Sequence, residues 1–230
     1  MSTWINVCRY HLIDRTTFAV TPWAVLAFMF CVNLAFTAAV PPGATGNDSL
    51  RGMLAGFFFC FGGLWAMTAR SLPFGLALGV SRRSYYTGSM LLCLSLAAGD
   101  GLVFAVLQVI EGATGGWGMG MYFFRVPHIL AGPWALTWLT SFVFLALMSA
   151  YGMWSGMIYR RWNHVGLLVF AAAHIIVLLT AVLVITWTHA WPHRAHAVAE
   201  LTPAELIGFL APLAAAMFAG GYATLRHVTV

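Results

Sequence analysis

The sequence predicts an all-α integral membrane protein with six transmembrane helices, and two observations carry this prediction. First, 61% of the 230 residues are hydrophobic and only 7% are charged, whereas about a quarter of the residues in a soluble domain are charged. Second, the apolar residues form six runs, each near the ~20 residues that a helix needs to cross a hydrocarbon core of about 30 Å. Helices are predicted because a backbone in lipid must satisfy its own hydrogen bonds.

The predicted spans belong to one transmembrane domain that covers residues 1–230. They lie at residues 18–40, 53–68, 89–110, 131–153, 165–187 and 206–225. Before the first span, residues 3–15 place Trp4, Cys8 and Leu12 on one helical face. This pattern is typical of an amphipathic helix that lies in the membrane interface. A disordered tail is the alternative for this segment.

The arginines predict which side of the membrane each loop occupies. With the N-terminus inside, eight of them lie in inner segments: Arg9, Arg15, Arg70, Arg82, Arg83, Arg160, Arg161 and Arg226. Three lie in outer segments: Arg51, Arg125 and Arg194. Because positive side chains favour cytoplasmic loops, both termini are predicted to be cytoplasmic. The net charge of +5 is therefore interpreted as a topology signal, and no nucleic-acid partner is expected.

The inner loop between the second and third spans carries the clearest local signals. Its sequence is SLPFGLALGVSRRSYYTG. Pro73 suits the first turn of a short helix, Gly79 suits its C-terminal cap, and Ser81 suits the N-cap of the next helix. Phe74 and Leu78 would give the short helix an apolar face at the cytoplasmic surface. That face either docks into a groove on a partner or folds back onto the bundle or the lipid.

Three polar residues in or beside the spans are candidate pathway residues. Asp100 lies in the middle of the third span, where a carboxylate is costly unless it is paired, hydrated or protonated. A functional role and an interhelical hydrogen bond are both open for it, and Gly99 and Gly101 would let another backbone approach. Glu111, at the outer end of that span, could orient the following glycine-rich loop by accepting backbone N–H bonds, or line the pathway. His174, midway along the fifth span, could bind substrate, carry a proton, ligate haem or simply form a hydrogen bond.

Three histidines near the outer end of the fifth span have spacings compatible with a metal site: His189, His193 and His196. However, Pro192 interrupts this segment, and no carboxylate or cysteine completes a ligand set before Glu200. We therefore expect interfacial histidines and no metal. The four cysteines form no CxxC pair. We therefore interpret them as small core residues and not as disulfide partners or metal ligands.

Two local stretches resemble a known family. Residues 74–88 contain an apolar segment followed by Leu-Gly-Val-Ser-Arg-Arg, an aromatic residue and Gly, and residues 111–118 are EGATGGWG. Together with the layout of the whole chain, these stretches resemble the permease subunits of type-2 ATP-binding-cassette (ABC) exporters. The likeness is greatest to the small six-helix permeases of actinobacteria. Neither stretch is a catalytic signature.

This resemblance implies a division of labour between subunits. Residues 3–15 would be the elbow helix, residues 188–205 would contain a re-entrant-like outer segment, and the inner loop would be the coupling helix that docks on a separate ATPase. The coupling residues would be Pro73, Phe74, Leu78, Gly79, Ser81, Arg82, Arg83 and Tyr85. Arg82 and Arg83 could pair with acidic groups of the ATPase or anchor in lipid headgroups.

The function that follows is ATP-driven export of a hydrophobic or amphipathic substrate across the bacterial plasma membrane. The chain has no GxxxxGK(S/T) phosphate-binding motif, so we do not expect it to be an enzyme or to bind a cofactor by itself. ATP and Mg would bind to the ATPase partner, and a second permease copy or a homologous permease would complete the pathway. Two alternatives stay open: a histidine-dependent membrane cytochrome that binds haem, and a non-transporting membrane scaffold or immunity protein.

Overall fold

The computed structural model describes residues 16, 20–39, 63, 66, 68–125, 132–189 and 202–227. Within these ranges the chain is almost entirely helical, and no residue of them lies in a strand. Four helices are long and apolar enough to cross a membrane: α2 (Thr21–Ala39), α6 (Arg82–Ala113), α7 (Trp134–Trp187) and α9 (Pro203–Arg226). A shorter helix, α5 (Thr68–Ala77), precedes α6, and a π-helical turn, η2 (Gly116–Gly120), follows it. The described part of the chain therefore has the architecture of an all-α membrane protein.

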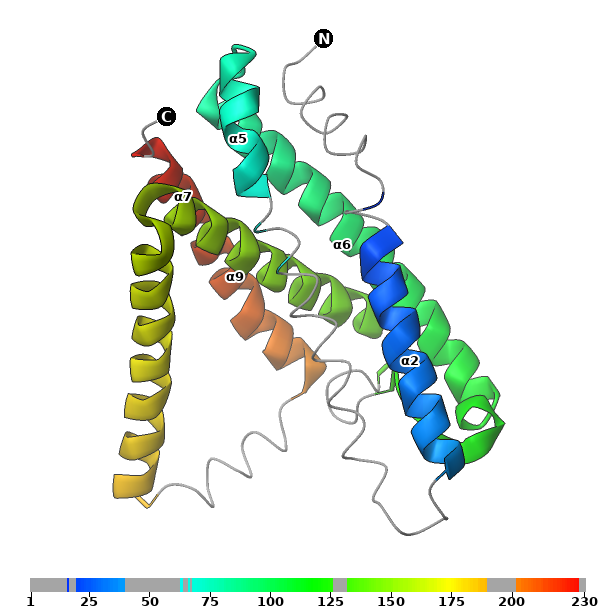
Figure 1. Cartoon of the computed structure of the whole chain (residues 1–230). Helices are drawn as coiled ribbons and strands as arrows, with labels where there is room; N and C mark the ends of the chain where they lie inside the picture. The colour runs from blue at the N-terminus through cyan, green and yellow to red at the C-terminus, as the bar shows by residue number, and fades with distance from the viewer. Residues whose placement is uncertain are drawn as a thin grey trace.

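Helix α7 is 54 residues long and turns back on itself (Figure 1). A straight helix of this length would extend about 80 Å, far more than the ~30 Å of a hydrocarbon core. The helical path breaks at Asn163, where φ is 52° and ψ is −148°. The first arm, residues 134–162, contains all but the first three residues of the predicted fourth span (131–153) and continues past its expected end. The second arm, residues 164–187, contains the predicted fifth span.

The predicted first, third and sixth spans correspond to α2, α6 and α9. Helix α9 begins at a capping box, in which Thr202 Oγ1 accepts a bond from the N–H of Glu205 and the Glu205 carboxylate accepts one from the N–H of Thr202. Each bond satisfies a donor that the first helical turn would leave without a partner. Three predicted segments lie mostly or wholly outside the described residues: the amphipathic helix at 3–15, the second span at 53–68 and the outer segment at 188–205.

The core forms where α6 meets the first arm of α7 and α9, and glycines let these helices approach closely. A Cβ added at Gly101 of α6 would lie 3.1 Å from the backbone nitrogen of Phe142 in α7. A Cβ added at Gly221 of α9 would lie 2.5 Å from the hydroxyl of Tyr86 in α6. That hydroxyl donates a hydrogen bond to the carbonyl of Phe218 at 2.7 Å. Small residues and interhelical hydrogen bonds of this kind hold helices together in lipid.

Most of the described arginines gather at one end of the bundle, which we call the arginine end. The α5–α6 connection, the bend of α7 and the C-terminal end of α9 all lie at this end (Figure 1). They carry Arg70, Arg82, Arg83, Arg160, Arg161 and Arg226. The described carboxylates lie elsewhere, with Asp100 inside α6, Glu111 near its C-terminus and Glu205 at the start of α9. The charge of the described chain is thus strongly asymmetric along the helix axes.

Candidate functional site

The corner between α5 and α6 is held by two helix caps. Gly79 has a φ of +79°, and its N–H donates to the carbonyl of Leu76 at 3.0 Å while the N–H of Val80 donates to the carbonyl of Gly75 at 3.1 Å. This is the Schellman arrangement, which ends a helix at a left-handed glycine. Ser81 then caps α6, since its hydroxyl accepts a bond from a backbone N–H of the first turn. The predicted capping roles of Gly79 and Ser81 are therefore confirmed.

The predicted position of Pro73 is wrong. Helix α5 begins at Thr68, so Pro73 lies inside the helix and not in its first turn. A proline there cannot donate to the carbonyl of Ala69, four residues earlier, which normally weakens a helix. The turn before the proline is stabilised by burial, because Ala69 and Leu72 are 2% and 0% exposed. The short helix was expected to begin near Pro73, but tertiary packing keeps the preceding residues from Thr68 helical.

The two sides of the corner differ in exposure. Phe74 is 53% exposed and Leu78 is 65% exposed. Tyr85, by contrast, is buried, and its hydroxyl lies 2.6 Å from that of Ser71 in α5. Its ring also packs on Gly75, where an added Cβ would lie 3.0 Å from Cδ2. Tyr85 therefore joins α5 to α6 from within the corner, while Phe74 and Leu78 form its outer surface.

The two neighbouring arginines of the corner have different surroundings. Arg82 Nη1 donates a hydrogen bond to the carbonyl of Arg226 at 3.1 Å. Arg226 is the last residue of α9, and a cation stabilises the exposed carbonyls at a helix C-terminus. Arg83 is exposed at the surface. Arg82 thus connects α6 to α9, whereas Arg83 contributes an exposed cation at the start of α6.

Asp100 lies in α6 close to Trp23 of α2. The adjacent Gly101 packs against the backbone of α7, as expected, but an added Cβ at Gly99 would meet nothing within 4 Å. Only one of the two glycines therefore serves close helix approach. The two roles that we considered for Asp100, an interhelical hydrogen bond and a place in the pathway, both stay predictions.

Glu111 is fully buried, and its carboxylate accepts four hydrogen bonds. Oε1 accepts from the N–H of Arg125 at 2.8 Å. Oε2 accepts from the N–H groups of Phe123 and Phe124 at 2.8 and 3.0 Å and from Trp117 Nε1 at 2.9 Å. The prediction that Glu111 orients the glycine-rich loop through backbone N–H groups is confirmed, although the backbone donors follow the loop instead of lying inside it.

Around this carboxylate, aromatic rings from α2 and the loop pack together. The ring of Phe30 in α2 lies 5.0 Å from that of Trp117, 5.6 Å from that of Phe123 and 6.0 Å from that of Phe124, measured between centroids. The turn that brings these rings together needs Gly116, because an added Cβ would lie 2.7 Å from the nitrogen of Met121. We call Glu111, its donors and Phe30 the Glu111 loop cluster. The participation of Phe30, Phe123 and Phe124 was missed from the sequence, which carries no local signal for it.

His174 lies in the second arm of α7 and forms a local hydrogen bond. Its Nδ1 is 2.7 Å from the carbonyl of Phe170, and its ring meets those of Phe170 and Tyr151 edge-on. Pathway and redox roles for His174 stay predictions. Among the described residues, no group of three or more His, Cys, Asp or Glu side chains is placed to share a metal ion. Of the three outer histidines only His189 is described.

Comparisons with known proteins do not place the chain in a family, since no protein-family model, no curated protein and no solved structure matches it. The function is therefore inferred from the geometry above and from the two local stretches of sequence.

Proposed function

We propose that this chain is the permease subunit of an ATP-driven exporter of the type-2 ABC class, and that a separate ATPase subunit docks at the α5–α6 corner. The observation that carries the proposal is the exposed apolar surface of Phe74 and Leu78 at the arginine end. An apolar surface at the cytoplasmic side is stabilised when a partner groove buries it. Arg83, which is exposed in the first turn of α6, favours a groove with acidic groups.

The corner is suited to transmit movement into the bundle because its side-chain contacts at Tyr85 and Arg82 join different helices. The Ser71–Tyr85 hydrogen bond and the packing on Gly75 couple α5 to α6. The bond from Arg82 to the carbonyl of Arg226 couples the start of α6 to the end of α9. A partner that displaces α5 would therefore tilt α6 and α9 against α7, and so open or close a path between helices.

The proposal includes six spans, with the second span completing the set formed by α2, α6, the two arms of α7 and α9. The arginine end would face the cytoplasm of a bacterial cell, as positive side chains favour that side, and both termini would lie there. Residues 3–15 would form the elbow helix and residues 188–205 the outer segment. ATP and Mg would bind the ATPase, and a second permease copy or a homologous permease would line the path of a hydrophobic or amphipathic substrate.

The test is capture of an ABC-type ATPase subunit from the same organism by the tagged, detergent-solubilised chain. We expect Phe74→Glu and Leu78→Glu to abolish capture, because a carboxylate cannot enter an apolar, acidic-rimmed groove without a large cost. Met119→Glu is the matched control, since Met119 is 45% exposed but lies in η2 at the opposite end of α6. Capture that survives Phe74→Glu would show that the corner is not the docking site.

The two alternatives make different predictions in the same preparation. A scaffold or immunity protein would not stimulate ATP hydrolysis by any co-purified subunit. A membrane cytochrome would show a haem Soret band in the visible absorption spectrum, and that band would contradict the permease proposal. We expect stimulated hydrolysis and no Soret band.

A further inference from the structure

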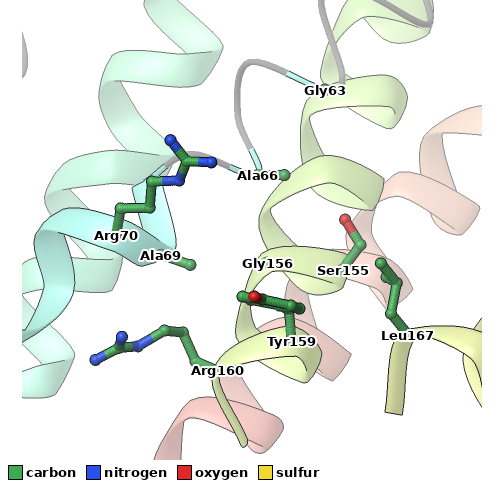
Figure 2. Close-up of a pocket in the computed structure, with 9 residues that line it drawn as sticks. All are labelled: Gly63, Ala66, Ala69, Arg70, Ser155, Gly156, Tyr159, Arg160 and Leu167. Atoms are coloured by element: carbon green, nitrogen blue, oxygen red, sulfur yellow. The ribbon is translucent and has the colours of Figure 1, made fainter. Parts of the chain in front are cut away.

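A pocket of about 340 Å³ lies at the arginine end, between α7 and the segment that leads into α5. Figure 2 shows Arg70 beside the α5 wall, and Ser155, Tyr159 and Arg160 on the first arm of α7. Leu167, from the second arm, closes a third side. The volume falls in the range of about 300–1,000 Å³ that small-molecule sites occupy.

The floor of the pocket is a close helix contact that sets the spacing of its walls. An added Cβ at Gly156 would lie 2.6 Å from the carbonyl oxygen of Ala66 and 3.0 Å from the Cβ of Ala69. Because the backbones touch here, Arg70 and Arg160 are held on two elements that contact each other. Any larger residue at position 156 would push these elements apart.

The polar side of the pocket is cationic. Arg70 and Arg160 are both exposed, and neither forms a salt bridge with a carboxylate in the described part of the chain. Tyr159 adds a hydroxyl, and Ser155 places a second one there while donating to the carbonyl of Gly152 at 2.8 Å. Guanidinium groups suit phosphate because they donate two parallel N–H bonds to its oxygens.

The third wall is apolar and continuous with a surface that would face lipid. Leu167 is 37% exposed, and the adjacent Leu168 and Val169 are 69% and 64% exposed. A ligand with a charged head between the arginines and hydrocarbon along the second arm of α7 would match both walls. Basic pockets between transmembrane helices at the cytoplasmic side have this headgroup chemistry.

We propose that this pocket binds the phosphate headgroup of an anionic lipid, with Arg70 and Arg160 as the phosphate ligands and Leu167 against an acyl chain. The site requires neither an ATPase partner nor transport. It is therefore independent of the proposed function.

Native mass spectrometry of the full chain tests this site, using micelles that hold equal amounts of dioleoyl phosphatidylglycerol and dioleoyl phosphatidylcholine. We expect the chain to retain phosphatidylglycerol preferentially. Arg70→Gln and Arg160→Gln should each lower the apparent affinity about fivefold, the contribution expected of one arginine near a lipid headgroup. Arg161→Gln is the matched control, because Arg161 neighbours Arg160 but stacks on Trp162 at 4.3 Å and does not line the pocket.

A second variant tests shape separately from charge. Gly63 lines the pocket, and an added Cβ there would meet no atom of the described residues within 4 Å, so Gly63→Leu should fold normally and reduce lipid retention by filling space. Equal retention of both lipids by the wild type, or an equal loss with Arg161→Gln and Arg160→Gln, would overturn the proposal. Arginine-dependent binding of inorganic phosphate without any preference for phosphatidylglycerol would show that the ligand comes from the aqueous phase, and would overturn the lipid assignment.

Discussion

The two ends of helix α6 differ in what they bury and what they expose. At its C-terminal end, the Glu111 carboxylate is buried and its two oxygens accept four hydrogen bonds from within the chain. At its N-terminal end, the α5–α6 corner exposes Phe74 and Leu78. At the C-terminal end the polar groups form hydrogen bonds within the chain, and at the N-terminal end apolar side chains are exposed. The contrast teaches that the groups that stabilise the chain and the exposed apolar groups are separated along one helix, as docking of the proposed partner at the corner would require.

The largest expected effect is at the C-terminal end of α6, where Glu111→Ala should lower the free energy of unfolding by about 3–4 kcal/mol. The reason is that three backbone N–H groups and the Trp117 indole would lose their acceptor in a buried place, and each such loss costs about 1–3 kcal/mol before relaxation. Thermal unfolding of the purified chain in detergent measures this loss. Glu111→Gln keeps one carbonyl oxygen and should cost less. An unchanged unfolding temperature in Glu111→Ala would mean that the Glu111 loop cluster does not stabilise this end.

An intermediate effect is expected at the cap of the corner, where Gly79→Ala should cost about 1 kcal/mol. Its φ of +79° is unfavourable for any residue with a Cβ, yet the added methyl would meet nothing within 4 Å. The cost is therefore purely conformational. Gly99→Ala is the matched control, because Gly99 is equally open but helical, so alanine should be neutral or slightly stabilising there. Equal unfolding temperatures for both variants would contradict the role of the left-handed cap.

The smallest effect on stability is expected from Phe74→Glu, which should change the free energy of unfolding by less than about 0.5 kcal/mol, as substitutions at exposed positions usually do. The same variant should lose the ATPase. This combination, measured by thermal unfolding beside the capture experiment, distinguishes a docking surface from a structural one. A large loss of stability would mean that Phe74 packs against the bundle or the lipid, the alternative considered from the sequence.

The local features of this protein could be predicted because they depend on short stretches of chain. Gly79 and Ser81 were recognised as caps, since a left-handed glycine and an N-cap hydroxyl act within a few residues. Glu111 was expected to bind backbone N–H groups of the following loop, because a carboxylate can accept several such bonds. The prediction for Pro73 was wrong for the opposite reason. The burial of Ala69 and Leu72, which depends on tertiary contacts, keeps the turn before the proline helical, so the helix does not start at Pro73.

Sequence by itself therefore determined the helical membrane class, the positions of most described helices and the asymmetry of the arginines, because hydrophobicity, length and charge act additively along the chain. Tertiary structure decided which groups meet. The bond from Arg82 to Arg226 joins residues far apart in the sequence, the Glu111 loop cluster draws Phe30 from α2, and the pocket between Arg70 and Arg160 exists only because Gly156 lets two helical segments touch. Such contacts depend on how helices cross and turn, and the break at Asn163 sets that geometry for α7.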